Sequence, residues 1–151
     1  MKERKRGREG EKGIKVAFWN VSGLKNKDSG FWEGLNKWDV IMMSETWVNE
    51  KEWKGLQRNV PKGYIWTMQE ARKEHERGRR MGGMVSGVRK ELVIKRKEGH
   101  NEPDMEGTIV RRIKVGRVKV DVVCVYRRRG WVENNKKMDG GKKGRASVDR
   151  G

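Results

Sequence analysis

The sequence predicts an α/β layered fold built on a mixed sheet. Short apolar runs indicate strands, two segments with apolar residues at helical spacing lie between the first three runs, and the rest of the chain reads mostly as strands. The first two strands are joined through a helix, so we expect them to be parallel neighbours. The later strands should pair mostly antiparallel, with the helices on one face of the sheet.

Composition suits a single small domain with basic arms. Of the 151 residues, 33% are hydrophobic and 39% are charged, so only part of the chain can form a core. Residues 1–12 and 127–151 are rich in charge and glycine, and we expect both to be disordered. Residues 13–126 should form the domain. The single cysteine, Cys124, lies in an apolar run, is expected to be a buried and inert thiol, and excludes an internal disulfide.

The first half of the domain alternates strands and helices. A strand is predicted over residues 14–19 and a second over 40–43. Asp28 or Ser29 can cap the helix between them. The apolar face of that helix recurs at helical spacing: Phe31, Trp32, Leu35 and Trp38.

A second helix is predicted to begin at Asn49. Glu52 follows three residues later, which is the spacing of a capping box, and Pro61 ends the segment. Its inner face would consist of Trp53, Leu56 and Val60.

The remaining elements are expected to be strands. Residues 71–80 are so highly charged that we predict a loop there, and the last two strands should form a hairpin that turns at Val115-Gly116. The predicted strands cover residues 64–69, 82–88, 91–97, 107–115 and 117–126.

The charge of the chain favours nucleic acid as a non-specific partner. The formal net charge is +17 and the isoelectric point about 10.3, and such a field concentrates polyanions. Charged, unselected tails on a weak fold are the alternative interpretation. No apolar stretch approaches the ~20 residues of a membrane helix and no secretory signal is found, so we expect no membrane and an intracellular location. The run KERKRGR allows a nuclear one.

Two polar residues follow the first two predicted strands. Asn20 ends the first and Glu45 ends the second. Ligands gather at the carboxyl ends of strands in open α/β sheets, so parallel neighbours would place these side chains side by side. A carboxylate beside an amide can hold Mg²⁺ and orient a phosphate. Alternatively, Glu45 only caps a loop or faces solvent.

Four motifs in order resemble the endonuclease/exonuclease/phosphatase family. They are KVAFWNVSGL, WDVIMMSETW, RRMGGMVSGV and VDVVCVY, and the closest likeness is to endonuclease domains of insect non-LTR retrotransposons. Members of this family have a strand that ends in Asn, here Asn20, and a Glu-Thr pair, here Glu45-Thr46. A Gly-Gly pair and a strand that ends in Tyr match Gly82-Gly83 and Tyr126.

The resemblance implies a DNase I-like four-layer α/β sandwich that hydrolyses phosphodiesters of DNA with Mg²⁺ or Mn²⁺. Asn20 would position the scissile phosphate or a metal-bound water, and Tyr126 would hydrogen-bond a phosphate oxygen; these are the candidate catalytic residues. Glu45, with Asn20, would hold the metal.

The chain departs from the family directly after Tyr126. It lacks the Gly-Asp-Phe-Asn motif and the Asp-His pair of the family, and His75 and His100 lie in charged segments. We therefore expect the N-terminal half of the sandwich, with weak metal binding and no activity alone, or else a non-catalytic basic nucleic-acid-binding remnant. Half a sandwich would leave a sheet face uncovered and favour self-association. The tryptophans are interpreted as core residues rather than stacking platforms.

Overall fold

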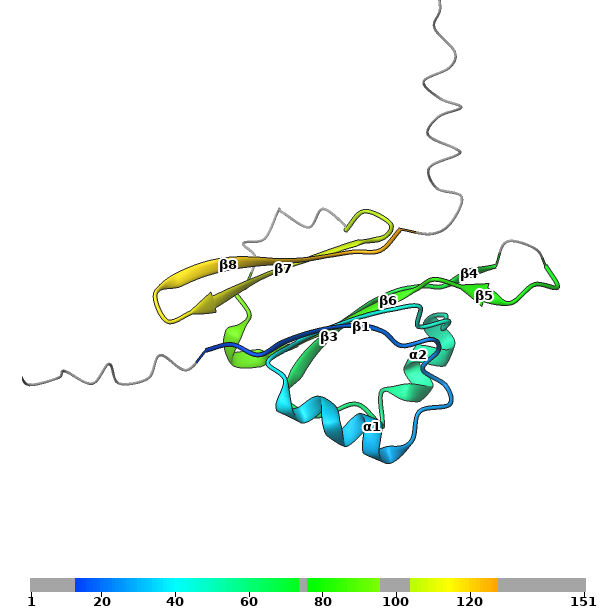
Figure 1. The fold of residues 1–151 in the computed structure, drawn as a ribbon, viewed down its shortest axis with the longest axis horizontal. Helices are drawn as coiled ribbons and strands as arrows, with labels where there is room; N and C mark the ends of the chain where they lie inside the picture. Colours follow the sequence, from blue (N-terminus) through cyan, green and yellow to red (C-terminus); the bar gives the residue numbers. More distant parts are fainter. Residues whose placement is uncertain (1–12, 74–75, 96–103, 128–151) are drawn as a thin grey trace, which may run out of the picture.

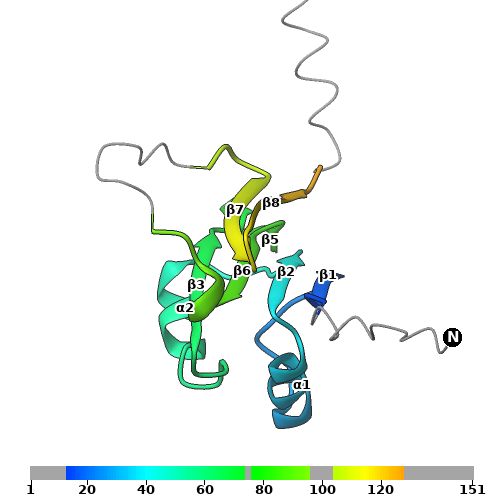
Figure 2. The same cartoon turned by 90° about the vertical axis from the view of Figure 1, so that its left-hand side faces the viewer.

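The computed structural model describes residues 13–73, 76–95 and 104–127, so the predicted arm at 1–12 and nearly all of the one at 127–151 lie outside it. In the described part, two short helices cover one face of a four-stranded sheet, and a β-hairpin lies over the opposite face (Figure 1, Figure 2). The mixed α/β class predicted from the sequence is confirmed at this level.

The central sheet has the order β1-β2-β6-β3. β1 and β2 are parallel, as predicted, with Asn20 directly beside Ser44. β6 pairs antiparallel with both β2 and β3. The strands are β1 Val16–Asn20, β2 Val40–Ser44, β3 Tyr64–Gln69 and β6 Met84–Arg89.

The helix layer follows the capping signals in the sequence. α1 (Ser29–Gly34) begins after Asp28, whose carboxylate accepts a hydrogen bond from the Phe31 amide at 2.8 Å, and it continues as the 3₁₀ turn η1 (Leu35–Lys37). α2 (Glu50–Leu56) begins with the predicted capping box of Asn49 and Glu52. The core between these helices and the sheet is formed by Val21, Leu24, Trp32, Leu35, Ile41, Met43, Val48, Trp53, Tyr64 and Val85.

The hairpin consists of β7 (Thr108–Val115) and β8 (Val118–Val125), and it forms a second core with the other face of the sheet. This core contains Val40, Met42, Met84, Val88, Ile109, Ile113 and Cys124. Cys124 is buried, as predicted, and its burial raises the pKa of its thiol. This face of the central sheet is therefore covered, contrary to the expectation of an open face, because the hairpin folds back over β2 and β6. Self-association of the chain stays a prediction.

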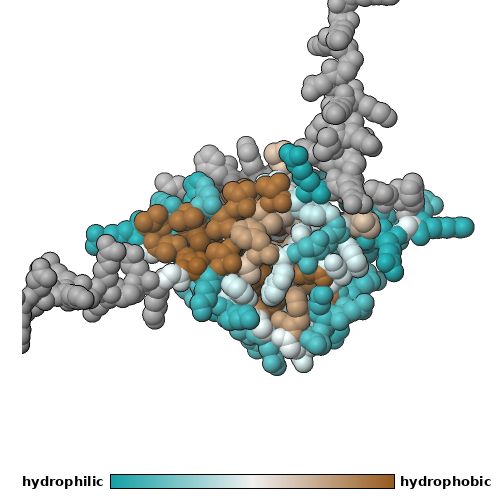
Figure 3. Space-filling model, viewed as in Figure 1, coloured by the Kyte–Doolittle hydropathy of each residue, from teal (hydrophilic) through white to brown (hydrophobic). Residues whose placement is uncertain are grey.

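Apolar surface remains on the hairpin and on β1. A brown patch in Figure 3 lies where Figure 1 draws the hairpin. Phe18 of β1 is also 57% exposed. The exposed valines of β8 are Val118, Val120, Val123 and Val125.

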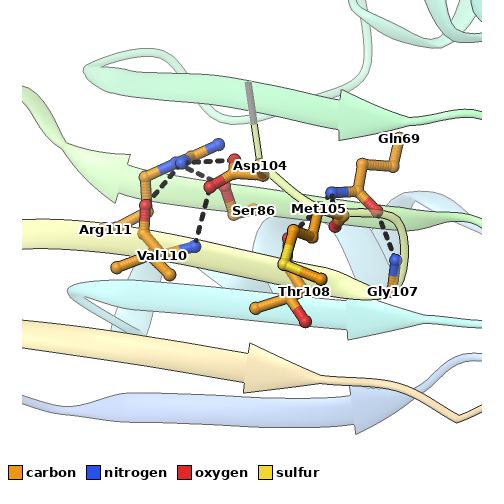
Figure 4. A network of polar contacts seen from close by, with 8 residues as sticks. All are labelled: Gln69, Ser86, Asp104, Met105, Gly107, Thr108, Val110 and Arg111. Carbon is orange, nitrogen blue, oxygen red and sulfur yellow. Dashed lines mark hydrogen bonds and ion pairs between the residues drawn. The ribbon is translucent and has the colours of Figure 1, made fainter. Parts of the chain in front are cut away.

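A polar network fastens the start of the hairpin to the central sheet (Figure 4). The Gln69 amide donates to the carbonyl oxygens of Met105 and Thr108 and accepts from the Gly107 amide at 3.0 Å. Further along β7, the Arg111 guanidinium contacts the Asp104 carboxylate at 2.8 Å and the Ser86 hydroxyl at 3.2 Å. These contacts orient β7 against β3 and β6.

Two predictions about the later elements were wrong. The charged segment 71–80 was expected to be a loop, but its described ends form the strand pair β4 (Arg72–Lys73) and β5 (Arg80–Met81). The strand predicted over 91–97 is not found up to residue 95; η2 (Lys90–Leu92) stands there, and Val93 makes an isolated bridge to Ile113 of β7. None of the helices in the described ranges is long and apolar enough to cross a membrane.

Candidate functional site

The carboxyl ends of β1 and β2 lie side by side and continue together beyond the sheet. The Val21 amide donates to the Ser44 carbonyl oxygen at 3.0 Å, and the Gly23 amide donates to the Glu45 carbonyl oxygen at 2.8 Å. Asn20 and Glu45 therefore stand at the same edge, as two parallel strands require.

Glu45 is a buried carboxylate held through one of its two oxygens. It is 8% exposed, and its Oε2 accepts hydrogen bonds from the Trp47 indole N–H at 2.5 Å and from the Gly82 amide at 3.0 Å. Within the described residues, Oε1 accepts no hydrogen bond. A carboxylate fixed in this way offers one oxygen to a cation or to water without having to reorient.

The backbone around this carboxylate is strained. The described residues other than glycine that have positive φ are Ser22 at 46°, Glu45 at 54° and Trp47 at 58°, and all three lie where β1 and β2 end. Such conformations cost of order 1–3 kcal/mol each and cluster at functional sites in proteins. The strain turns the Trp47 ring back over Gly23, so that its indole N–H meets Glu45.

The Gly82-Gly83 pair forms the second wall of the site. The carbonyl oxygen of Gly82 accepts from the Trp47 amide at 3.0 Å, and that of Gly83 accepts from the Thr46 amide at 3.3 Å. Both glycines have positive φ, 73° and 83°. A Cβ on Gly83 would lie 2.5 Å from the Thr46 hydroxyl oxygen, so the close approach requires glycine.

Tyr126, directly after β8, lies near the Gly82-Gly83 pair. It is half-buried, and its Cε1 lies 3.7 Å from where a Cβ of Gly82 would stand. Its amide donates to the Gly107 carbonyl oxygen at 2.8 Å, which fixes the chain just beyond the strand. Gly82 thus donates to Glu45 and lies near the Tyr126 ring, so two of the three predicted site residues, Glu45 and Tyr126, border the same glycine.

Asn20 is exposed and its side chain is oriented by Ser22. Its Oδ1 accepts from the Ser22 amide and from the Ser22 hydroxyl, each at 3.2 Å. The amide nitrogen is therefore the group that Asn20 offers to a ligand, and it is a donor. This geometry suits contact with a phosphate oxygen better than coordination of a cation.

Sequence reasoning missed two residues of this site, Ser22 and Trp47. Their roles depend on positive φ, which no apolar pattern signals. Among the described residues, no group of three or more His, Cys, Asp or Glu could hold a metal ion. Asp121 lies in the hairpin, where it contacts Arg112 at 2.7 Å. His75, His100 and Asp139 lie outside the described residues.

Fold and site together define a mixed α/β protein with an oriented carboxylate, an amide and a phenol near one end of its sheet. Neither a scan against models of known protein families nor a search of curated proteins finds a match to the chain.

Proposed function

We propose that the chain is an endonuclease/exonuclease/phosphatase-type domain that binds nucleic acid and receives a phosphate beside a divalent cation at Glu45. One observation carries the proposal. Glu45 is buried, has one oxygen fixed by two N–H donors and has the other open, and it lies at the strand ends beside Asn20. The net charge of +17 supports a polyanionic ligand.

The residues have separable roles in this proposal. Glu45 supplies the single carboxylate of a weak site, in which the cation keeps most of its water. Asn20 donates from its side-chain nitrogen to a phosphate oxygen, and the Tyr126 hydroxyl donates to another. A bound Mg²⁺ would neutralise charge on the phosphate. Because one carboxylate leaves Mg²⁺ mostly hydrated, we expect its dissociation constant from this site to be on the order of millimolar.

Metal binding can be tested with Mn²⁺, whose unpaired electrons broaden nearby NMR signals. We expect the Trp47 indole N–H and the Gly82 amide to broaden first, since both donate to Glu45. The substitution Glu45→Gln should abolish this broadening, while Glu33→Gln, at an exposed residue of α1, should leave it unchanged. Broadening centred on Asp104 or Asp121 would place the cation elsewhere.

The 151 residues should bind nucleic acid without cleaving it. No residue of the sequence matches the water-activating Asp-His pair of the family or its Gly-Asp-Phe-Asn motif. Loss of general base catalysis alone typically costs about 10²–10⁴-fold in rate. Purified protein with Mg²⁺ should therefore leave supercoiled plasmid at the background rate of nicking. Nicking that depends on Mg²⁺ and disappears in Glu45→Gln would show a complete catalytic site and contradict this expectation.

A non-catalytic nucleic-acid-binding function is the second candidate. The single carboxylate of the site and the large positive charge favour it. The two candidates differ in the role of Glu45. If Mg²⁺ strengthens binding to an oligonucleotide in the wild type and not in Glu45→Gln, the phosphate and cation share a site. If the substitution has no effect at any Mg²⁺ concentration, the charge alone accounts for binding.

A further inference from the structure

Three aromatic rings form a continuous cluster where β1 meets α1. The Trp19 ring lies 6.0 Å from the Phe31 ring and 6.3 Å from the Trp38 ring, measured between centroids. Trp19 is 40% exposed, and both of its neighbours are half-buried. The cluster therefore presents aromatic surface to solvent beside Asn20, the next residue of the chain.

Two lysines stand over this cluster. The Lys27 ammonium lies 5.5 Å from the centre of the Phe31 ring, and the Lys37 ammonium lies 5.7 Å from the centre of the Trp38 ring. Two acidic residues lie near the cluster in sequence. Asp28 directs its carboxylate to the Phe31 amide as a helix cap, and Asp39 accepts from the Lys15 amide and the Arg89 guanidinium. Two lysine ammonium groups thus lie close to the rings, and the carboxylates of Asp28 and Asp39 are engaged elsewhere.

Core packing does not account for Trp19. Two tryptophans of the helix layer are buried in the core: Trp32 is 5% exposed and Trp53 is 4% exposed. Trp19 instead leaves much of its indole in water, where apolar surface is unfavourable. Exposed aromatic rings interleaved with lysines are the combination that single-stranded nucleic acid binds, because every base offers a face for stacking and every nucleotide a phosphate.

We propose that Trp19, Phe31 and Trp38 form a stacking platform for an unpaired base, and that Lys27 and Lys37 contact the adjoining phosphates. The inference rests on the proposed function for the class of ligand, nucleic acid, and adds that the bound part is single-stranded. Duplex cannot use the platform without unpairing, since its bases already stack on one another.

The test compares two exposed aromatic residues of the same strand. Trp19→Leu removes the indole face and keeps an apolar contact for Phe31. Phe18→Leu is the matched control, because Phe18 is 57% exposed and directs its side chain to the opposite face of β1. Fluorescence anisotropy of the full chain would give dissociation constants for oligo(dT), for oligo(rU) and for duplex DNA of the same length at one low salt concentration.

Trp19→Leu should weaken binding of the single strands by about 5- to 150-fold, the range found when one stacking residue is removed. Trp19→Leu should change the dissociation constant for duplex by less than about twofold. Phe18→Leu should change the dissociation constants for single strands and for duplex little. Oligo(dT) and oligo(rU) should respond alike, because stacking does not read the sugar. Equal losses for single strand and duplex, or an equal loss in Phe18→Leu, would overturn the platform.

A second variant covers the case in which Trp19→Leu does not fold. Lys27→Gln with Lys37→Gln leaves the rings intact and should weaken single strands more than the pair Lys51→Gln with Lys54→Gln on α2, which removes the same charge. If the two pairs weaken single strands equally, only net charge matters and the platform is refuted. The Mn²⁺ experiment tests the cation site at Glu45 and not the aromatic cluster, so the two proposals can fail separately.

Discussion

At the scale of single residues, the site depends on backbone conformations that most side chains avoid. Ser22, Glu45 and Trp47 have positive φ, and Gly82 and Gly83 do so opposite them. The hydrogen bonds of this region hold the strained segment against the glycine pair. Substituting one of these residues should therefore alter the site even when the chemistry of Glu45 is untouched.

Two glycine substitutions test this with opposite expected signs. Gly83→Ala would set a Cβ 2.5 Å from the Thr46 hydroxyl and 3.0 Å from the Ala71 backbone nitrogen, at a φ of 83°. We expect a loss of about 2–4 kcal/mol in the free energy of unfolding. Gly55→Ala, in α2 with no atom near the new Cβ, should instead gain about 0.5–1 kcal/mol. Urea unfolding measures both. A neutral Gly83→Ala would mean that the two segments are not in close contact.

The positions of the site residues could be predicted from the sequence, but their contacts could not. Placement of Asn20 and Glu45 at one edge follows from two short apolar runs joined through a helix, and the register of β1 and β2 bears it out. The contacts from Trp47 and Gly82 to Glu45 could not be predicted. The first depends on positive φ at both Glu45 and Trp47, and the second joins segments 37 residues apart.

At the scale of elements, those with a clear apolar pattern or a capping signal in the sequence were predicted well. α2 begins at its capping box, and β3 covers the predicted run of residues 64–69. Short pairings inside charged sequence were not predicted. β4 and β5 contain two residues each and carry arginine, lysine and methionine, so no alternation marks them. Val93 looked like a strand residue because it is apolar, but it bridges the edge of β7 at Ile113.

The cap of α2 gives an element-scale prediction with a pH dependence. Glu52 accepts from the Asn49 amide and pairs with Lys25 and Arg80, each at 2.9 Å. Burial of Glu52 raises its pKa, but the hydrogen bonds and positive charges of these partners outweigh burial and lower the pKa below 4.5 overall. A lowered pKa means that the stabilisation is present above the unfolded value and disappears as the pH falls through the folded value.

Glu52→Gln isolates the charge, because glutamine keeps an oxygen for the Asn49 amide. We expect the variant to lose up to about 1 kcal/mol at pH 7, and to differ little from wild type once the pH is well below 4.5. Urea unfolding at a series of pH values measures the difference. Glu50→Gln, an exposed i,i+4 pair with Lys54, should show a smaller change. A difference between Glu52→Gln and wild type that persists at low pH would rule out the charge as its cause.

At the scale of the whole molecule, the net charge should govern how nucleic acid is bound. Neutralisation of phosphates by Lys and Arg releases counterions, so the association constant should fall steeply with salt. We expect a loss of at least about tenfold between 50 and 200 mM NaCl for any duplex sequence. Anisotropy titrations of two duplexes of unrelated sequence would test both the slope and the absence of preference. A flat salt dependence would remove charge as the basis of binding.

The strand order of the central sheet also determines how early the sheet can form while the chain is being synthesised. β6 lies between β2 and β3, although both of those strands precede it in the chain. A ribosome must therefore reach residue 89 before β2 gains its second neighbour or β3 gains any in this sheet. Until then the apolar side chains of β2, including Met42 and Met43, belong to a nascent chain with an open pairing edge, where chaperones or misfolding compete with the native sheet.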